Sequence, residues 1–258
     1  MEVVTQMTWE DMKEENGKII PFPQQIQTES DKQPPSSEIV IRKKGEKSHK
    51  ANYIREESLI DEIKSYLLHH TGKYGYRNYM IFLTGIETGR RCGDILKLKV
   101  SDVYNGKDVY NIIEYDEQKT STAKDFAVSE AFCKELKTYI LRQGLQQDDY
   151  LFTTQKPNEK GEYIMKVRSF YNILQRAKRD LHLDLHLSTH SMRKTFARHH
   201  YDDIVANPSL CTLTPLDMVQ QLLGHKSNTV TWVYLDLQDD ERSKVVNNKT
   251  FCKGVDNL

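Results

Sequence analysis

Four short segments of the sequence carry side chains that could act together on a phosphate ester. They read TGRRCGD at 88–94, EQKTSTAK at 117–124, THSMR at 189–193 and LGHKSNTVTWVY at 223–234. An arginine presents a planar fork of N–H donors that binds two phosphate oxygens and neutralises their charge. Histidine and lysine can carry protons, and a tyrosine hydroxyl can attack phosphorus to give a covalent phosphotyrosine. These side-chain types are suited to transferring a phosphodiester bond.

Each segment, taken alone, also has an ordinary structural interpretation. Arg91 could be a surface helix arginine, and Lys119 could be a turn lysine. His190 and Arg193 are three positions apart, so they would share one face of a helix as a surface pair. His225 follows a helix-ending glycine, where an imidazole faces the negative end of the helix dipole. The tyrosine that ends the fourth segment could be a buried aromatic side chain.

The order of the segments changes this interpretation. Arg…Lys…His-x-x-Arg…Leu-Gly-His-x8-Tyr resembles the tyrosine recombinase (phage integrase) family over residues 55–240. TGRR matches the family's T-G-x-R, HSMR matches H-x-x-R, and LGH matches L-G-H. The lysine falls in a turn between two predicted strands, where the family carries its mobile catalytic lysine. The catalytic positions that match are Arg91, Lys119, His190, Arg193, His225 and Tyr234, and Asp94 falls on the family's usual acidic position.

The resemblance implies a DNA strand-transferase that forms a 3′-phosphotyrosine through Tyr234 and then rejoins the strand. Arg91 and Arg193 would bind the non-bridging oxygens and stabilise charge that grows in the transition state. With an ordinary pKa of about 10, Tyr234 needs help to lose its proton. His190 is the candidate general base, and His225 would donate a hydrogen bond to the phosphate or act as a second acid or base.

Two further residues would support this chemistry. Lys119 would protonate the departing 5′ oxygen, and Asp94 would orient the first arginine or the neighbouring histidine. No metal or organic cofactor is expected, since side chains supply the positive charge. His182, His186 and His190 are spaced by four, but LHLDLHL alternates leucine with polar residues and predicts an extended segment. Histidines on such a segment do not gather as ligands, so we expect no zinc site.

The elements that must position these residues are mainly helical, with a small antiparallel hairpin, an α+β class. Apolar residues three and four apart predict a helix at 56–70, and apolar residues four apart predict one at 129–142. Further helices are predicted at 78–89, 90–103, 167–181, 190–204 and 214–225. Thr214 as cap, Pro215 at the first helical position and Gly224 after the last give the clearest local signal. DVYNIIEY at 108–115 and AKDFAVS at 123–129 are rich in β-formers and predict the two strands.

The chain divides into three expected parts. Residues 1–50 hold four of the seven prolines and predict a flexible, polar and basic arm, while 51–238 would be the catalytic domain. The arm ends in a basic cluster that is either a solvated linker or a contact to the DNA backbone. It has too little apolar content for the helical core-binding domain that many family members carry. The tail at 239–258 would dock on a neighbouring protomer, as it often does in the family.

Double-stranded DNA is the expected partner, although Lys+Arg 37 and Asp+Glu 37 give a formal net charge of zero. Binding would therefore need a local basic face. The candidate residues for it are Lys43, Lys44, Arg168, Arg176, Lys178, Arg179, Lys194 and Arg198. The resemblance also implies a homo-oligomer, a tetramer at the synapse, and an accessory DNA-bending protein is left open.

The remaining expectations concern location and alternative functions. The four cysteines form no CxxC pair and fit a reducing cytoplasm, and no run approaches the roughly 18 apolar residues of a membrane span. We expect a cytoplasmic protein that associates with the nucleoid when it binds DNA. Two alternatives remain: a DNA-binding regulator on the same fold that no longer recombines, and a relaxing enzyme that resembles type IB topoisomerases and shares the chemistry. The target site, and the choice among integration, excision and resolution, do not follow from the sequence.

Overall fold

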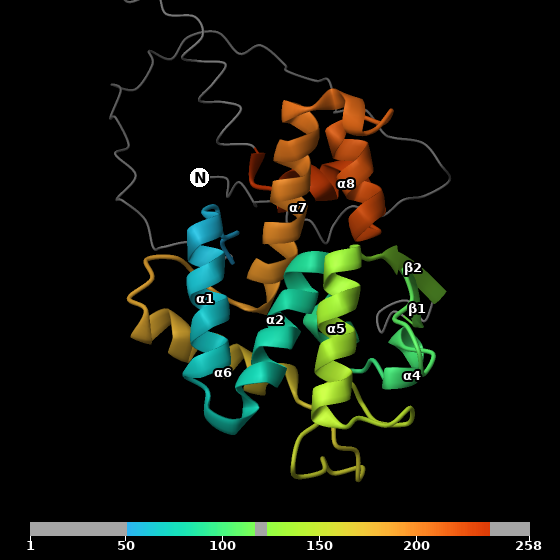
Figure 1. Cartoon of the computed structure of the whole chain (residues 1–258). Coiled ribbons are helices and arrows are strands. Elements are labelled where there is room, and N and C mark those ends of the chain that lie inside the picture. Colours follow the sequence, from blue (N-terminus) through green and yellow to red (C-terminus); the bar gives the residue numbers. More distant parts are fainter. Residues whose placement is uncertain (1–50, 117–122, 238–258) are drawn as a thin grey trace, which may run out of the picture. The chain divides into compact units, whose positions relative to one another are not determined.

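The computed structural model describes residues 51–116 and 123–237, all of which belong to one unit of the chain. Figure 1 draws the elements of these ranges in colour. The predicted features that lie outside the described residues are the arm at 1–50 with Lys43 and Lys44, the hairpin-turn lysine Lys119, and the tail at 239–258.

Within these ranges the chain is mostly helical and carries a two-stranded antiparallel sheet, as the sequence predicted. In chain order the elements are α1 (Glu57–His69), η1 (Gly72–Tyr74), α2 (Gly75–Thr88), α3 (Cys92–Ile95), α4 (Val100–Val103), β1 (Ile112–Asp116), β2 (Ala123–Ala127), α5 (Glu130–Gln143), α6 (Val167–Asp180), α7 (Thr189–Ala206), η2 (Pro208–Leu210), α8 (Pro215–Leu223) and α9 (Asn228–Tyr234). None of the described helices is long and apolar enough to cross a membrane.

Several helices begin and end at the capping residues that the sequence predicted. At the start of α5, Ser129 Oγ accepts the Phe132 N–H at 3.1 Å. Thr214 caps α8, and Pro215 occupies its first position, where its missing N–H costs no hydrogen bond. The same helix ends at Gly224 with φ of +65°, a left-handed conformation that glycine adopts without strain. These local signals are confirmed.

The helix predicted at 90–103 is wrong as one element, because it is interrupted between α3 and α4. The Leu98 carbonyl accepts the Leu151 N–H at 2.7 Å, and Lys99 pairs with Tyr150 as an isolated β-bridge. A backbone that pairs with a distant segment in this way is extended, so it cannot continue a helix.

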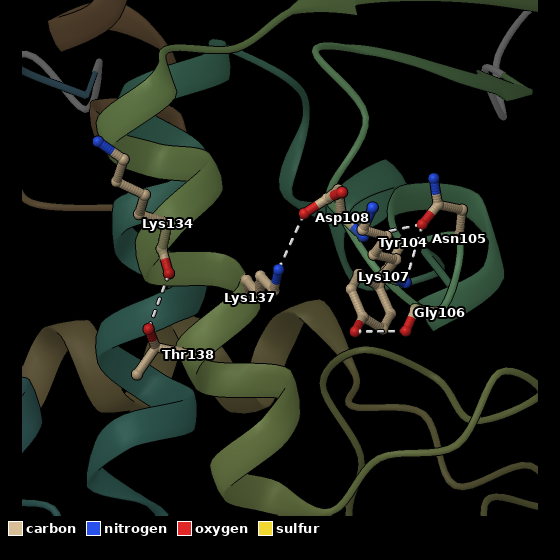
Figure 2. Close-up of polar contacts among 8 residues, drawn as sticks. All are labelled: Tyr104, Asn105, Gly106, Lys107, Asp108, Lys134, Lys137 and Thr138. Atoms are coloured by element: carbon tan, nitrogen blue, oxygen red, sulfur yellow. Dashed lines mark hydrogen bonds and ion pairs between the residues drawn. The ribbon is translucent and has the colours of Figure 1, made fainter.

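The first strand begins later than the predicted range of 108–115. The residues before Ile112 form a turn in which Asn105 Oδ1 accepts the Asp108 N–H at 2.8 Å. Figure 2 shows this turn beside α5, where Lys137 Nζ forms an ion pair with Asp108 at 2.9 Å. The turn chemistry therefore outweighs the β-propensity of the first residues in the range.

The main apolar core gathers around α2, which contacts α1, α5 and α7 (Figure 1). Phe82, on α2, is fully buried. At Gly85 a Cβ would lie only 2.6 Å from Met192 Sδ and 2.9 Å from Met192 Cβ. The absence of a side chain at Gly85 thus allows α2 and α7 to approach closely. The arginine of the first segment follows α2, and the arginine of the third segment lies on α7.

A second apolar cluster holds α8 and α9 against α7. Its buried members are Phe196, Ala197, Val219, Leu223, Leu235 and Leu237. Because α9 carries the tyrosine of the fourth segment, this cluster decides where that tyrosine lies relative to α7.

The backbone before α1 also lies along α7. The Asn52 N–H donates to the His186 carbonyl at 3.1 Å, and the Ile54 N–H donates to Thr195 Oγ1 at 2.9 Å. His199 Nε2 lies 2.9 Å from the Ile54 carbonyl, and the Ile54 side chain is fully buried. These contacts fix the segment that precedes α1 along the helix that bears HSMR.

Candidate active site

The TGRR segment forms the turn between α2 and α3. Thr88 Oγ1 donates to the Thr84 carbonyl at 2.6 Å in the last turn of α2, and Gly89 then adopts φ of +61°. A Cβ on Gly89 would lie 2.3 Å from the Phe196 ring, so a side chain has no room there. Arg91 follows in extended backbone immediately before α3. The left-handed φ of Gly89 and its close contact with Phe196 on α7 therefore place Arg91 beside α7.

Helix α7 presents the third segment to this turn. Ser188 caps the helix and accepts the His190 N–H at 3.2 Å. Arg193, one turn further on, is only 3% exposed. Its Nη1 donates to the Gly89 carbonyl at 2.6 Å and its Nη2 to the Leu223 carbonyl at 2.8 Å. The guanidinium is thus oriented by the backbone of both neighbouring segments.

Arg91, His190 and Arg193 line one cavity of about 350 Å³. The buried carboxyl residue Asp94 also lines it, from α3. The remaining lining residues are Cys92, Gly93, Val167 and Thr189. Two guanidinium groups and an imidazole that converge on one concave site are suited to binding an anion with several oxygens.

The environment of His190 favours the neutral form of its imidazole. Burial lowers the pKa of His190, and the positive charges of Arg193 and Arg91 lower it further. A neutral imidazole at neutral pH has a nitrogen lone pair that can accept a proton.

Tyr234 and His225 lie together beside α7. The two rings meet edge to face with centroids 5.2 Å apart, and His225 Nδ1 lies 3.1 Å from Thr231 Oγ1 on α9. Lys194 Nζ lies 5.5 Å from the centre of the Tyr234 ring. The Tyr234 ring therefore contacts both a histidine and a lysine, and Tyr234 does not line the cavity.

The Tyr234 hydroxyl is buried from solvent. Burial raises the pKa of Tyr234 to about 12, and the positive charges of Arg193 and Arg91 oppose this rise without cancelling it. In this conformation the hydroxyl is protonated at neutral pH. Both arginines therefore favour the ionised form of the phenol, and burial favours the protonated form.

The candidate DNA-binding residues separate into two groups. Arg168, Arg176 and Arg179 are exposed on α6, and Lys178 is half-buried there. The expectation that Lys194 and Arg198 share an exposed basic face is wrong, because these residues are 7% and 8% exposed. Both form ion pairs within the protein, Lys194 with Asp236 and Arg198 with Asp202.

The segment LHLDLHL and Arg90 differ from what the sequence indicated. The segment LHLDLHL is a loop between α6 and α7 and not an extended strand, and His182 in it has φ of +52°. No cluster of three or more His, Cys, Asp or Glu in the described ranges is placed to hold a metal. Arg90, beside Arg91, is buried and contacts three elements, although nothing in its spacing distinguished it from a surface arginine.

Comparison with known proteins places this arrangement in a family. The model of the phage integrase family matches residues 54–241. A protein of Bacillus subtilis (strain 168), named Probable integrase/recombinase YoeC, is 29% identical over 195 residues, which are 74% of this chain and 93% of that protein. The structures of XerA recombinase and of XerH site-specific recombinase match with TM-scores of 0.54 and 0.55 at 22% and 19% identity. Each match covers 76% of this chain, but 64% of the XerA chain and 53% of the XerH chain.

The fold is that of tyrosine recombinase catalytic domains, a helical assembly with a small two-stranded sheet. The chain belongs to the phage integrase family, since the family model matches well over half of its residues.

Proposed function

We propose that this chain is a site-specific DNA recombinase or integrase that cleaves and rejoins strands through a covalent 3′-phosphotyrosine on Tyr234. The observation that carries the proposal is the convergence of Arg91, His190 and Arg193 on one cavity, with Tyr234 within reach of both guanidinium charges. Family membership and the likeness to a protein named integrase/recombinase support the same reaction.

In the proposed reaction, Arg91 and Arg193 bind the non-bridging oxygens of the scissile phosphate. The Tyr234 oxygen attacks phosphorus while its proton passes to His190, and the bond from phosphorus to the 5′ oxygen breaks. Lys119 gives the departing 5′ oxygen a proton, and His225 donates a hydrogen bond to the phosphate or acts as a second acid or base. Asp94 orients Arg91 or the neighbouring histidine. Rejoining reverses these steps with a 5′ hydroxyl as the nucleophile.

The buried Tyr234 hydroxyl sets a condition on this reaction. The hydroxyl is buried and the ring packs on His225, so DNA binding has to expose the hydroxyl to the bound phosphate. Exposure to the cavity would also remove the desolvation that raises the pKa of Tyr234. DNA binding and activation of the nucleophile are therefore coupled in this proposal.

The proposal assigns double-stranded DNA as the partner, which the DNA-bound state of the XerH structure supports by analogy. The exposed arginines of α6 are the described candidates for its phosphates. Residues 51–238 would form the catalytic domain, 1–50 a basic arm and 239–258 a tail that docks on a neighbouring protomer. A tetramer at the synapse, an accessory DNA-bending protein and association with the nucleoid belong to the same proposal.

Replacement of Tyr234 tests the nucleophile. The probe is a pool of labelled, nicked half-site duplexes of random sequence, in which cleavage releases a short strand and traps the protein on DNA. We expect Tyr234→Phe to abolish trapping while binding to the same duplexes persists, because the phenylalanine lacks the attacking oxygen. Tyr201→Phe changes a tyrosine that packs on the same second cluster and should still trap DNA. A Tyr234→Phe protein that traps DNA would show that another residue is the nucleophile.

Assays on supercoiled plasmids separate the proposed recombinase from the two alternatives. A recombinase exchanges strands between two sites, a relaxing enzyme only removes supercoils, and a regulator does neither. Sequencing of the duplexes that become covalently attached would then give the preferred target sequence.

A further inference from the structure

Arg90 is a buried arginine that the family pattern leaves unassigned, since it occupies the x of T-G-x-R. It is 5% exposed, although its side chain is charged. Burying an arginine is costly unless its N–H groups and its charge find partners. The partners of Arg90 therefore indicate what this residue does in the fold.

These partners come from three elements. Arg90 Nε donates to the Thr88 carbonyl at 3.1 Å, at the end of α2. Arg90 Nη2 donates to the Leu222 carbonyl in the last turn of α8. The guanidinium also lies 5.5 Å from the centre of the Phe126 ring, on β2. One side chain thus joins the α2–α3 turn to the end of α8 and to the hairpin.

A second arginine also binds the end of α8, at the carbonyl of the residue that follows Leu222. Arg193 Nη2 donates to the Leu223 carbonyl at 2.8 Å, and its Nη1 donates back to Gly89 at 2.6 Å. The last carbonyls of a helix have no partners within it, and cations there are favoured by the helix dipole. Arg90 and Arg193 therefore bind consecutive carbonyls at a helix end, where their charge has the largest effect.

The backbone just beyond this helix end carries a residue of the candidate site. Gly224 ends α8 in the left-handed conformation, and the next residue is His225. The His225 N–H donates to the Gln220 carbonyl at 3.0 Å, so the histidine backbone is continuous with the last turn. A displacement of that turn would move His225 and would release one of the two carbonyls that orient Arg193.

We propose that Arg90 is a positioning residue for strand transfer. By holding the Leu222 carbonyl, it fixes the last turn of α8 against the α2–α3 turn and so sets His225 and Arg193 relative to Arg91. This inference rests on the proposed function, because it concerns the rate of the same reaction. Arg90 itself does not touch the phosphate.

The test compares Arg90→Met with a control that shares its physical character. Arg77 is also buried, donates to a distant carbonyl, that of Thr153, at 2.9 Å, and lies 4.3 Å from the centre of the Tyr74 ring. It lies at the beginning of α2, whereas Arg90 follows its end. Arg77→Met therefore reports the cost of losing a buried arginine without disturbing the end of α8.

Two measurements are made on the full chain at a temperature where each variant is folded. The first is the single-turnover rate of covalent trapping on the random-sequence nicked duplexes, with affinity for the same duplexes measured separately. We expect Arg90→Met to lower the trapping rate about 10- to 100-fold at unchanged affinity, because small displacements of catalytic groups cost factors of this size. The second is hydrogen exchange of the 220–226 peptide without DNA, which should become faster in Arg90→Met and remain unchanged in Arg77→Met.

Arg90→Lys keeps the charge and one donor at the helix end, so it should restore part of the trapping rate. Arg90→Lys also provides the test of the inference if Arg90→Met does not fold. Wild-type trapping rates in Arg90→Met, or losses that follow stability equally in both methionine variants, would overturn the inference. If the wild-type protein traps no DNA, the proposed function fails, but hydrogen exchange still decides the positioning role. Unchanged exchange of 220–226 in Arg90→Met would then refute it.

Discussion

At the scale of single residues, burial shifts in opposite directions the pKa values of the two groups between which the proposed reaction passes a proton. It lowers the pKa of His190 and raises the pKa of Tyr234 to about 12. Transfer from the tyrosine to the histidine is therefore unfavourable in the described conformation. The negative charge of a phosphodiester between the arginines would offset their effect on His190, and movement of Tyr234 to the cavity would remove its desolvation. In the proposed reaction, this proton transfer therefore becomes favourable only once DNA is bound.

The lowered pKa of His190 predicts a pH dependence. A general base works in its unprotonated form, so the trapping rate at subsaturating DNA should rise with pH through a pKa below about 6.5 and stay level at neutral pH. The measurement is single-turnover trapping as a function of pH. His190→Gln should lower the rate about 100- to 10,000-fold and remove the acidic limb. His69→Gln, on the exposed side of α1, should keep the limb. An identical limb in His190→Gln would assign it to another group.

The order of the residue types predicted the gathering of Arg91, His190 and Arg193, because that order resembles the tyrosine recombinase family. The burial of Lys194 was not predictable in the same way. Its partner Asp236 is 42 positions away, beyond the tyrosine, and the pair forms only once α9 has packed on α7. The burial of Arg90 was not predictable for a similar reason, since its partner, the Leu222 carbonyl, is 132 positions away.

At the scale of elements, the turn after α2 depends on a glycine for two separate reasons. Gly89 has φ of +61°, and a Cβ there would lie 2.3 Å from the Phe196 ring. Gly144 ends α5 with almost the same angle, +62°, but a Cβ there would meet nothing within 4 Å. The two positions therefore separate backbone strain from steric overlap.

Alanine at each of these glycines gives a matched prediction. Gly144→Ala should destabilise the protein by about 1–2 kcal/mol, the cost of a left-handed alanine. Gly89→Ala should add about 1–3 kcal/mol of overpacking to that cost. Urea unfolding followed by circular dichroism measures both free energies of unfolding. Equal losses in the two variants would mean that the Phe196 ring moves aside without cost, and that the turn is less tightly packed than its contacts indicate.

The ends of the helices were predictable where neighbouring residues determine them. Ser129, Thr214 and Gly224 end or begin helices by hydrogen bonds and φ angles that involve only neighbouring residues. The break between α3 and α4 was not predictable, because it follows from pairing of Leu98 with Leu151, more than fifty positions along the chain. Sequence periodicity does not contain that information.

At the scale of the whole molecule, a formal net charge of zero gives little long-range attraction to DNA. Several basic side chains near the site are also unavailable to DNA, since Arg90, Lys194 and Arg198 are buried and partnered within the protein. Affinity must then come from exposed cations concentrated on one surface. Among the described helices, α6 carries Arg168, Arg176 and Arg179 on its exposed side.

The salt dependence of DNA binding tests this surface. Each phosphate that a protein cation contacts adds about 0.9 to the magnitude of the slope of log Kobs against log salt concentration. Replacing Arg168, Arg176 and Arg179 with glutamine should therefore lower that magnitude by about 0.9 for each arginine that contacts a phosphate. A charge-matched control replaces three exposed lysines of α5 and the following loop, Lys134, Lys156 and Lys160. Both variants lose three positive charges, so a change in net charge alone would weaken them equally. A slope that falls as much in the lysine variant would show that binding follows total charge and not the face of α6.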